Sequence, residues 1–165
     1  MNGLWQSLFD LLRLRAGPQD LPDSRPLTLV VIGVYVAQAV VTSGAVDENG
    51  SATRSLMAIA LQFLAVAIFL AWRRRPERLQ QTLLAFAATG IVISIVAFTL
   101  LLQSDPGVNQ PLLALAWFVI FGWSLAVDAN IFRHALDIAM PIAMLIAVLL
   151  LAFTYVVLEL VLKQV

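Results

Sequence analysis

Five long apolar runs dominate this chain, and short polar or proline-bearing segments separate them. They cover residues 27–45, 55–72, 79–103, 111–127 and 138–158. A helix needs about 20 residues to cross roughly 30 Å of hydrocarbon. We therefore predict an all-α fold, a polytopic membrane helical bundle with five transmembrane helices. The fourth run is the shortest, so a re-entrant fourth segment is the main competing topology.

An amphipathic segment precedes these runs. In residues 2–16 the apolar side chains recur on one face of a helix, and Trp5 suits the headgroup boundary of a bilayer. This pattern predicts an N-terminal interfacial helix, with a helix packed under the bundle as the alternative. Prolines at 18, 22 and 26 then break the helix. We divide the chain into an N-terminal amphipathic helix and proline-rich connector, residues 1–26, and a transmembrane domain, residues 27–165.

The composition agrees with a membrane protein. Of the 165 residues, 61% are hydrophobic and 12% are charged, whereas about a quarter are charged in a soluble domain. The formal net charge is zero, which argues against a nucleic-acid partner. The chain has no cysteine and one histidine, His134, so we exclude disulfides, thiol catalysis and His/Cys zinc sites. We expect no cofactor, and we expect membrane lipids as partners.

Basic residues are distributed unevenly between the predicted loops. Eight fall on one side of the bundle, and only Arg54 and Lys163 fall on the other. The eight are Arg13, Arg15, Arg25, Arg73, Arg74, Arg75, Arg78 and Arg133. Because cytoplasmic loops retain Lys and Arg, this split predicts a cytoplasmic N-terminus and a periplasmic C-terminus in a bacterial inner membrane. The topology-determining loop is the one that contains Arg73, Arg74, Arg75 and Arg78.

Rows of small residues predict where the helices pack, because helices in lipid associate through close backbone approach. In the third run the row is Ala87, Gly90, Ser94 and Ala97, and in the fifth it is Ala135, Ala139, Ala143 and Ala147. Pro141 lies about one turn into the fifth run, where we expect a packing kink, with a hinge as the alternative.

One polar cluster falls in the predicted loop between the fourth and fifth runs: Asp128, Asn130, Arg133, His134 and Asp137. His134 and Asp137 have the i+3 spacing of a hydrogen-bonded pair that could relay a proton. Charged residues at helix ends ordinarily anchor a loop to headgroups, however, and we favour that interpretation.

Two glutamines, Gln38 and Gln62, lie well inside the first and second runs. An unpaired amide in hydrocarbon costs several kcal/mol, so each needs a partner on another helix, and a mutual contact is plausible. Apart from Glu159 near the outer edge, no run carries an acid or a base at mid-depth. This argues against an ion-coupled transporter that acts alone.

The runs WFVIFGWSLAV at 117–127 and IFRHAL at 131–136, together with five closely spaced spans and an outside C-terminus, resemble the Yip-domain family. These are the Ypt/Rab-interacting membrane proteins and their bacterial relatives. The resemblance extends over about residues 4–162, but the chain lacks the Asp-Leu-Tyr-Gly-Pro sequence and the long N-terminal region of eukaryotic members. It implies a non-enzymatic membrane protein that works through lateral or cytoplasmic contacts, and it carries over no catalytic residue.

Together these features favour a non-catalytic scaffold or accessory subunit of a membrane assembly, with other integral membrane proteins or further copies of itself as partners. One alternative is a component of a small-solute or lipid transporter or channel. In that case the first, second and fifth spans would enclose a path that uses Gln38, Gln62 and Tyr155. A second alternative is an intramembrane enzyme centred on His134 and Asp137.

Overall fold

The computed structural model describes residues 2–46, 51–105 and 107–162, and across these ranges the chain is helical, with no strand. Five of the helices, α2 to α6, are long and apolar enough to cross a membrane. This confirms the predicted all-α membrane helical bundle. The elements are α1 (Asn2–Leu12), η1 (Pro18–Asp20), α2 (Arg25–Val46), α3 (Ser51–Trp72), η2 (Pro76–Arg78), α4 (Leu79–Leu101), α5 (Pro111–Leu136) and α6 (Met140–Leu162).

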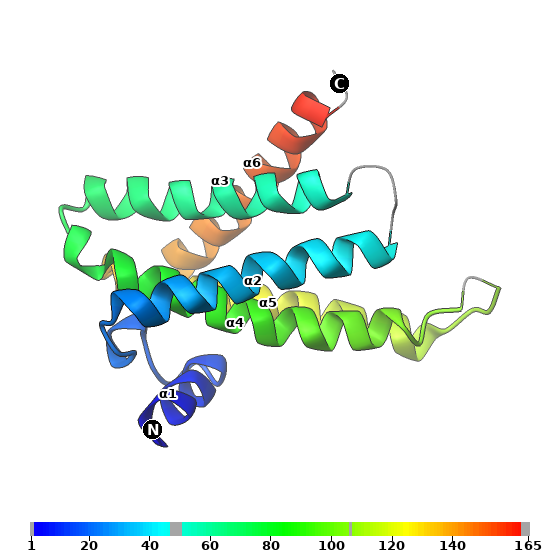
Figure 1. The fold of residues 1–165 in the computed structure, drawn as a ribbon, viewed down its shortest axis with the longest axis horizontal. Coiled ribbons are helices and arrows are strands. Elements are labelled where there is room, and N and C mark those ends of the chain that lie inside the picture. Colours follow the sequence, from blue (N-terminus) through cyan, green and yellow to red (C-terminus); the bar gives the residue numbers. More distant parts are fainter. Residues whose placement is uncertain (1, 47–50, 106, 163–165) are drawn as a thin grey trace.

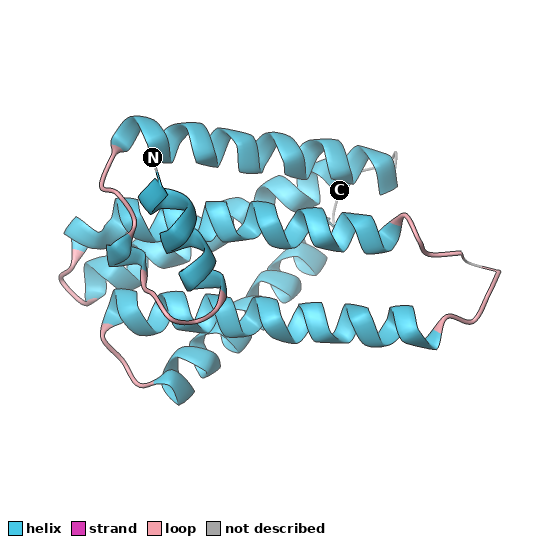
Figure 2. Ribbon diagram, turned by 90° about the horizontal axis from the view of Figure 1, so that it is seen from below, coloured by secondary structure: helices cyan, strands magenta, loops and turns pink. Residues whose placement is uncertain are grey.

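The long helices α2, α3, α4 and α5 run along the long axis of the molecule, and α6 crosses them at an angle (Figure 1). α2 packs against α3 and α4, whereas α5 packs against α4 and α6, and α6 also contacts α3. The turn η2 and the α5–α6 connection lie at one end, and the α4–α5 connection lies at the other (Figure 2). We refer to the end that contains η2 and the α5–α6 connection as the arginine end.

The hydrophobic core is concentrated in the half of the bundle nearest the arginine end. Phe132 on α5 lies at its centre, with its ring centroid 6.1 Å from that of Phe69 and 5.1 Å from that of Phe86. The other buried side chains come mainly from the last turns of α3 and α5 and the first turns of α4 and α6. In the opposite half, the first three turns of α5 are largely exposed. The bundle is therefore well packed at one end and open at the other.

Helix α1 packs against α4 and α5 at the arginine end. Leu8 and Leu11 are buried there, whereas the side chains of Trp5 and Phe9 are 65% and 60% exposed. The helix ends at Leu12, four residues before the predicted end, because the chain turns at Leu14 with a φ of 61°. One face of α1 is thus packed under the bundle, as the alternative proposed. Contact of the other face with a bilayer surface stays a prediction.

The predicted boundary of the fourth span is wrong. α5 continues to Leu136, and only the segment from Asp137 to Ala139 connects it to α6. The helix passes beyond Asp128 because the residues that follow include Ile131 and Phe132, which are buried in the core. At 26 residues α5 is the longest helix, about 39 Å at 1.5 Å per residue. The re-entrant alternative is therefore also wrong.

The predicted kink at Pro141 is wrong as well. α6 begins at Met140, so Pro141 is its second residue. In the first turn of a helix the backbone N–H has no intrahelical partner, so a proline there removes no hydrogen bond. Pro26 occupies the same place in α2, where the sequence predicted it.

The two predicted rows of small residues differ in the structure: the first lies along one helix, and the second is divided between two helices. Ala87 is buried, Ser94 and Ala97 are half-buried, and a Cβ on Gly90 would lie 2.7 Å from the ring of Tyr35. Gly90 therefore permits the close approach of α2 to α4. The predicted alanine row on the fifth span is wrong in part, because the helix break divides it. Ala135 is buried on α5, Ala139 is exposed in the connection, and Ala143 and Ala147 are buried on α6.

The fold makes a prediction about accessibility from the two sides of a membrane. The chain has no native cysteine, so a single introduced cysteine reacts without background. We expect Glu77→Cys, in η2, and Ser104→Cys, in the α4–α5 connection, to react with a membrane-impermeant maleimide from opposite sides of sealed vesicles. Both positions are exposed. Labelling of both from the same side would contradict a membrane-spanning α4.

Candidate functional site

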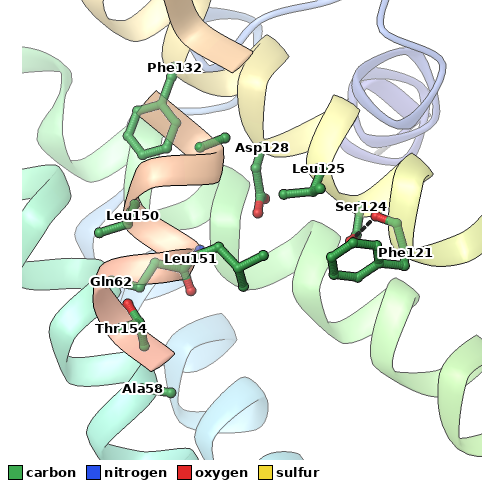
Figure 3. Close-up of a pocket in the computed structure, with 11 residues that line it drawn as sticks. Ala58, Gln62, Phe121, Ser124, Leu125, Asp128, Phe132, Leu150, Leu151 and Thr154 are labelled. Carbon is green, nitrogen blue, oxygen red and sulfur yellow. Dashed lines mark hydrogen bonds between the residues drawn. The ribbon is translucent and has the colours of Figure 1, made fainter. Parts of the chain in front are cut away.

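A cavity of about 180 Å³ lies between α3, α5 and α6 (Figure 3). Four polar side chains line it: Gln62 from α3, Ser124 and Asp128 from α5, and Thr154 from α6. The other lining residues are apolar: Ala58, Phe121, Leu125, Phe132, Ala147, Leu150 and Leu151. The cavity forms where α6 diverges from the other helices, just beyond the packed core.

Asp128 is the chemically distinctive residue of this cavity. It lies eight residues before Leu136, the end of α5, which is about 12 Å at 1.5 Å per residue. Gln62 lies at a similar depth, ten residues before the end of α3. The Asp128 side chain is half-buried and makes no hydrogen bond or ion pair with any residue that the structure describes. A carboxyl group is thus placed within a membrane-spanning helix without a hydrogen bond or ion pair from the described part of the chain.

The remaining polar groups leave part of the hydrogen-bonding capacity of the cavity free. Ser124 Oγ donates to the backbone oxygen of Phe121 on its own helix, at 2.8 Å. The hydroxyl of Ser124 and the side chains of Gln62 and Thr154 surround the space beside Asp128 (Figure 3). The site therefore offers a carboxyl group, an amide and two hydroxyls within apolar walls. This set can bind a small polar or charged solute.

The predicted contact between Gln38 and Gln62 is wrong. Gln38 Nε2 donates to the backbone oxygen of Ile91 on α4, at 3.4 Å, and its Oε1 is buried without a partner. Gln62 instead faces α5 and α6 across the cavity. Gln38 does not line the cavity and Tyr155 is 64% exposed, so the cavity does not coincide with the solute path hypothesised through the first, second and fifth spans, which stays a prediction.

His134 and Asp137 do not form the predicted pair. His134 Nδ1 is hydrogen-bonded to the backbone oxygen of Asn130 at 2.9 Å, and the imidazole packs against Gly17. Asn130 Nδ2 in turn donates to the backbone oxygen of Ala16 at 2.9 Å. These contacts hold the connector after α1 onto α5. The intramembrane enzyme centred on His134 and Asp137 therefore loses its structural basis.

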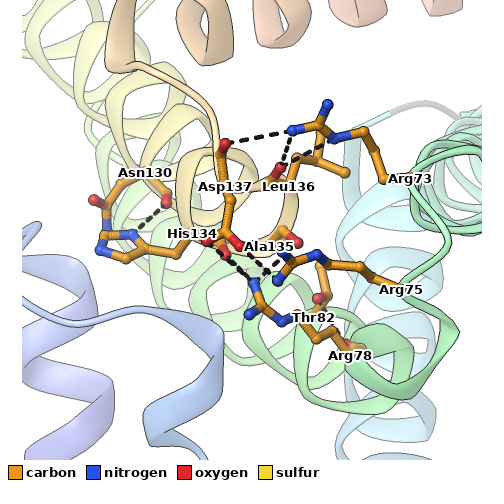
Figure 4. A network of polar contacts seen from close by, with 9 residues as sticks. All are labelled: Arg73, Arg75, Arg78, Thr82, Asn130, His134, Ala135, Leu136 and Asp137. Atoms are coloured by element: carbon orange, nitrogen blue, oxygen red, sulfur yellow. Dashed lines mark hydrogen bonds and ion pairs between the residues drawn. The ribbon is translucent and has the colours of Figure 1, made fainter.

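Three of the four arginines in the topology-determining loop bind the C-terminal end of α5 (Figure 4). Arg73 Nη2 donates to the backbone oxygen of Leu136 at 2.8 Å, and Arg78 Nη1 donates to that of His134 at 2.8 Å. Arg75 and Arg78 form ion pairs with Asp137. The last carbonyls of a helix lack intrahelical partners and carry partial negative charge, so these cations stabilise the helix end. Arg133 is exposed and lies outside this arginine cluster.

The sequence pattern of polar residues predicts a loop at Asp128, so the cavity could not be inferred from it. The sequence does contain a relevant pattern: Ile131, Phe132 and Ala135 continue the helical spacing of apolar residues beyond Val127. This pattern indicates that Asp128 lies within a helix. Within the described ranges, no group of three or more His, Cys, Asp or Glu side chains could hold a metal ion.

No protein-family model, no curated protein and no solved structure matches this chain. The resemblance to the Yip-domain family therefore rests on the residues and the hydropathy pattern alone, and it stays a prediction.

The arginine cluster generates a prediction about stability. We expect Arg78→Ala to lower the free energy of unfolding by about 1 kcal/mol, because carbonyls at the end of α5 and Asp137 lose a charged donor. Arg74→Ala is the matched control: the side chain of Arg74 is exposed and makes no hydrogen bond or ion pair in the described part of the chain, while its backbone N–H donates to the backbone oxygen of Ala71 at 3.0 Å. Unfolding in detergent, followed by circular dichroism, measures both. Equal effects of the two variants would show that the contacts contribute nothing.

For Asp128 we expect a substitution to increase stability, in contrast to Arg78. We expect Asp128→Leu to raise the free energy of unfolding by about 1–3 kcal/mol, because it removes an unpaired carboxyl group from an apolar environment. The same unfolding measurement in detergent tests this. A less stable variant would mean that Asp128 has a structural partner in the folded protein.

Proposed function

We propose that this protein is a non-catalytic integral membrane protein that binds a small solute inside the bilayer, as part of a transporter or channel. The observation that carries the proposal is the unpaired carboxyl group of Asp128 in the cavity between α3, α5 and α6. An ionisable residue within a membrane segment is costly, and such residues typically mark ion or substrate pathways.

The size and position of the cavity support a small solute. Pockets for drug-sized ligands are typically about 300–1,000 Å³, whereas this cavity is about 180 Å³. It also lies within the apolar length of the helices, where bulk water does not provide hydrogen bonds. A solute that pairs with Asp128 and Gln62 would gain interactions that the surrounding lipid does not offer.

The charge distribution supports an orientation for the chain. Arg73, Arg75 and Arg78 lie at the arginine end, close to α1, and Arg54 lies at the opposite end beside Glu159. Lys163 lies outside the described residues. Under the positive-inside rule the arginine end and the N-terminus face the cytoplasm, and the C-terminus faces the periplasm of a bacterial cell.

A second candidate function is the scaffold or accessory subunit. The observation that favours it is the open half of the bundle, where the large side chains of Phe118 and Trp123 on α5 are exposed. Helices from another membrane protein or from a second copy would cover this surface by close packing. Under this alternative the Asp128 cavity has no role, so a change that fills it leaves the activity of the assembly unaltered.

A substitution that fills the cavity tests the solute-binding proposal. Ala58 on α3 lines the cavity, and we expect Ala58→Phe to occupy the space that a solute needs. In proteoliposomes exposed to a panel of small cationic, neutral and anionic solutes, the wild type should take up at least one solute faster than protein-free liposomes. Ala58→Phe should abolish that difference.

Ala60→Phe is the matched control, because Ala60 is exposed two residues along the same helix and does not line the cavity. It should behave as the wild type. If no solute distinguishes the wild type from Ala58→Phe, the proposed function is wrong.

A further inference from the structure

The cavity contains one ionisable side chain. Among its lining residues Asp128 alone titrates, and Gln62, Ser124 and Thr154 contribute neutral polar groups. When Asp128 is ionised, a neutral solute leaves the carboxylate without a countercharge and an anion is repelled by it, whereas a cation pairs with it. The charge balance of the cavity therefore favours a cation.

Among the described residues, no basic side chain forms an ion pair with Asp128. The guanidinium groups of Arg73, Arg75 and Arg78 are bound at the end of α5 and at Asp137. That end lies about 12 Å along the helix from Asp128. One turn away from Asp128 on α5 are Ser124, Leu125, Ile131 and Phe132, and none of them is basic.

Aromatic rings and aliphatic walls indicate an organic cation. Phe121 and Phe132 both line the cavity, on either side of Asp128 (Figure 3). The faces of aromatic rings attract alkylammonium groups, and such rings recognise quaternary ammonium ligands in many proteins. A bare metal ion would need more oxygen ligands than one carboxyl group and a few neutral groups supply.

We propose that the cavity binds a small organic cation, whose ammonium group pairs with Asp128 and whose alkyl groups contact the apolar wall that includes Phe121. This inference rests on the proposed function, because it specifies the chemical class of the solute. The volume of about 180 Å³ restricts the cation to a few carbon atoms.

Choline is a suitable probe, because 3,3-dimethyl-1-butanol has the same shape without the charge. We expect radiolabelled choline to bind the purified protein in detergent, measured by equilibrium dialysis, and tetramethylammonium to displace it. The neutral alcohol should compete at least tenfold more weakly, since it lacks a charge-assisted interaction with Asp128. This comparison uses only the wild-type protein and does not depend on the folding of a variant.

Two variants and a control locate the binding. Asp128→Asn should weaken choline binding about tenfold or more, and Phe121→Leu should weaken it severalfold through loss of the cation–π contact. Asp105→Asn makes the same charge change at an exposed position outside the cavity, and it should bind choline as the wild type does. Circular dichroism of each variant verifies that it is folded.

The outcomes separate this inference from the proposed function. If choline does not bind, if the neutral alcohol competes equally, or if Asp128→Asn binds choline unchanged, the cation assignment is wrong. Uptake of a neutral or anionic solute that Ala58→Phe abolishes would then leave the proposed function standing. If Ala58→Phe changes the uptake of no solute but choline binds with the expected dependence on Asp128, the transport role is wrong and the cation site stands.

Discussion

The fold depends on the hydrogen bonds and ion pairs made to the carbonyl groups at the C-terminal end of α5. The last carbonyls of a helix have no partner within the helix, and here Arg73 and Arg78 donate to them while Asp137 pairs with Arg75 and Arg78. These contacts join the α3–α4 connection to the end of α5 and to the α5–α6 connection. Helices α3, α4 and α5 are thereby held together at the arginine end. The aromatic core around Phe132 lies directly beside that end.

The open end of the bundle follows from this arrangement. The packed core and the contacts of Arg73, Arg75 and Arg78 lie in one half, whereas the described residues of the other half include an ion pair between Arg54 on α3 and Glu159 on α6. α6 diverges from the other helices (Figure 1). The cavity lies between α6, α3 and α5 (Figure 3). A site for a small molecule and a well-packed core can therefore coexist in 165 residues, because each occupies its own half of the bundle.

Asp128 lowers the stability of the fold and at the same time provides a group that can bind a ligand. A carboxyl group in a membrane helix opposes stability by a few kcal/mol, and the half-buried side chain makes no hydrogen bond or ion pair with the described residues to offset that cost. Stability lost at one position is typical of sites that bind or react, where the group must remain available to a ligand. The connector after α1 shows the contrasting case, because Asn130 and His134 use their polar atoms to hold it in place.

The sequence by itself determined the number of membrane helices, the position of Pro26 at the start of α2, and the uneven distribution of arginine. These are properties of segments, set by length, hydropathy and charge. Only the tertiary structure decided that α5 continues through Asp128, that Gln38 and Gln62 face different neighbours, and that the arginines bind a helix end. In a chain whose lipid-facing and core-facing residues are equally apolar, helical periodicity is weak, so the sequence does not reveal which face of a helix points inward.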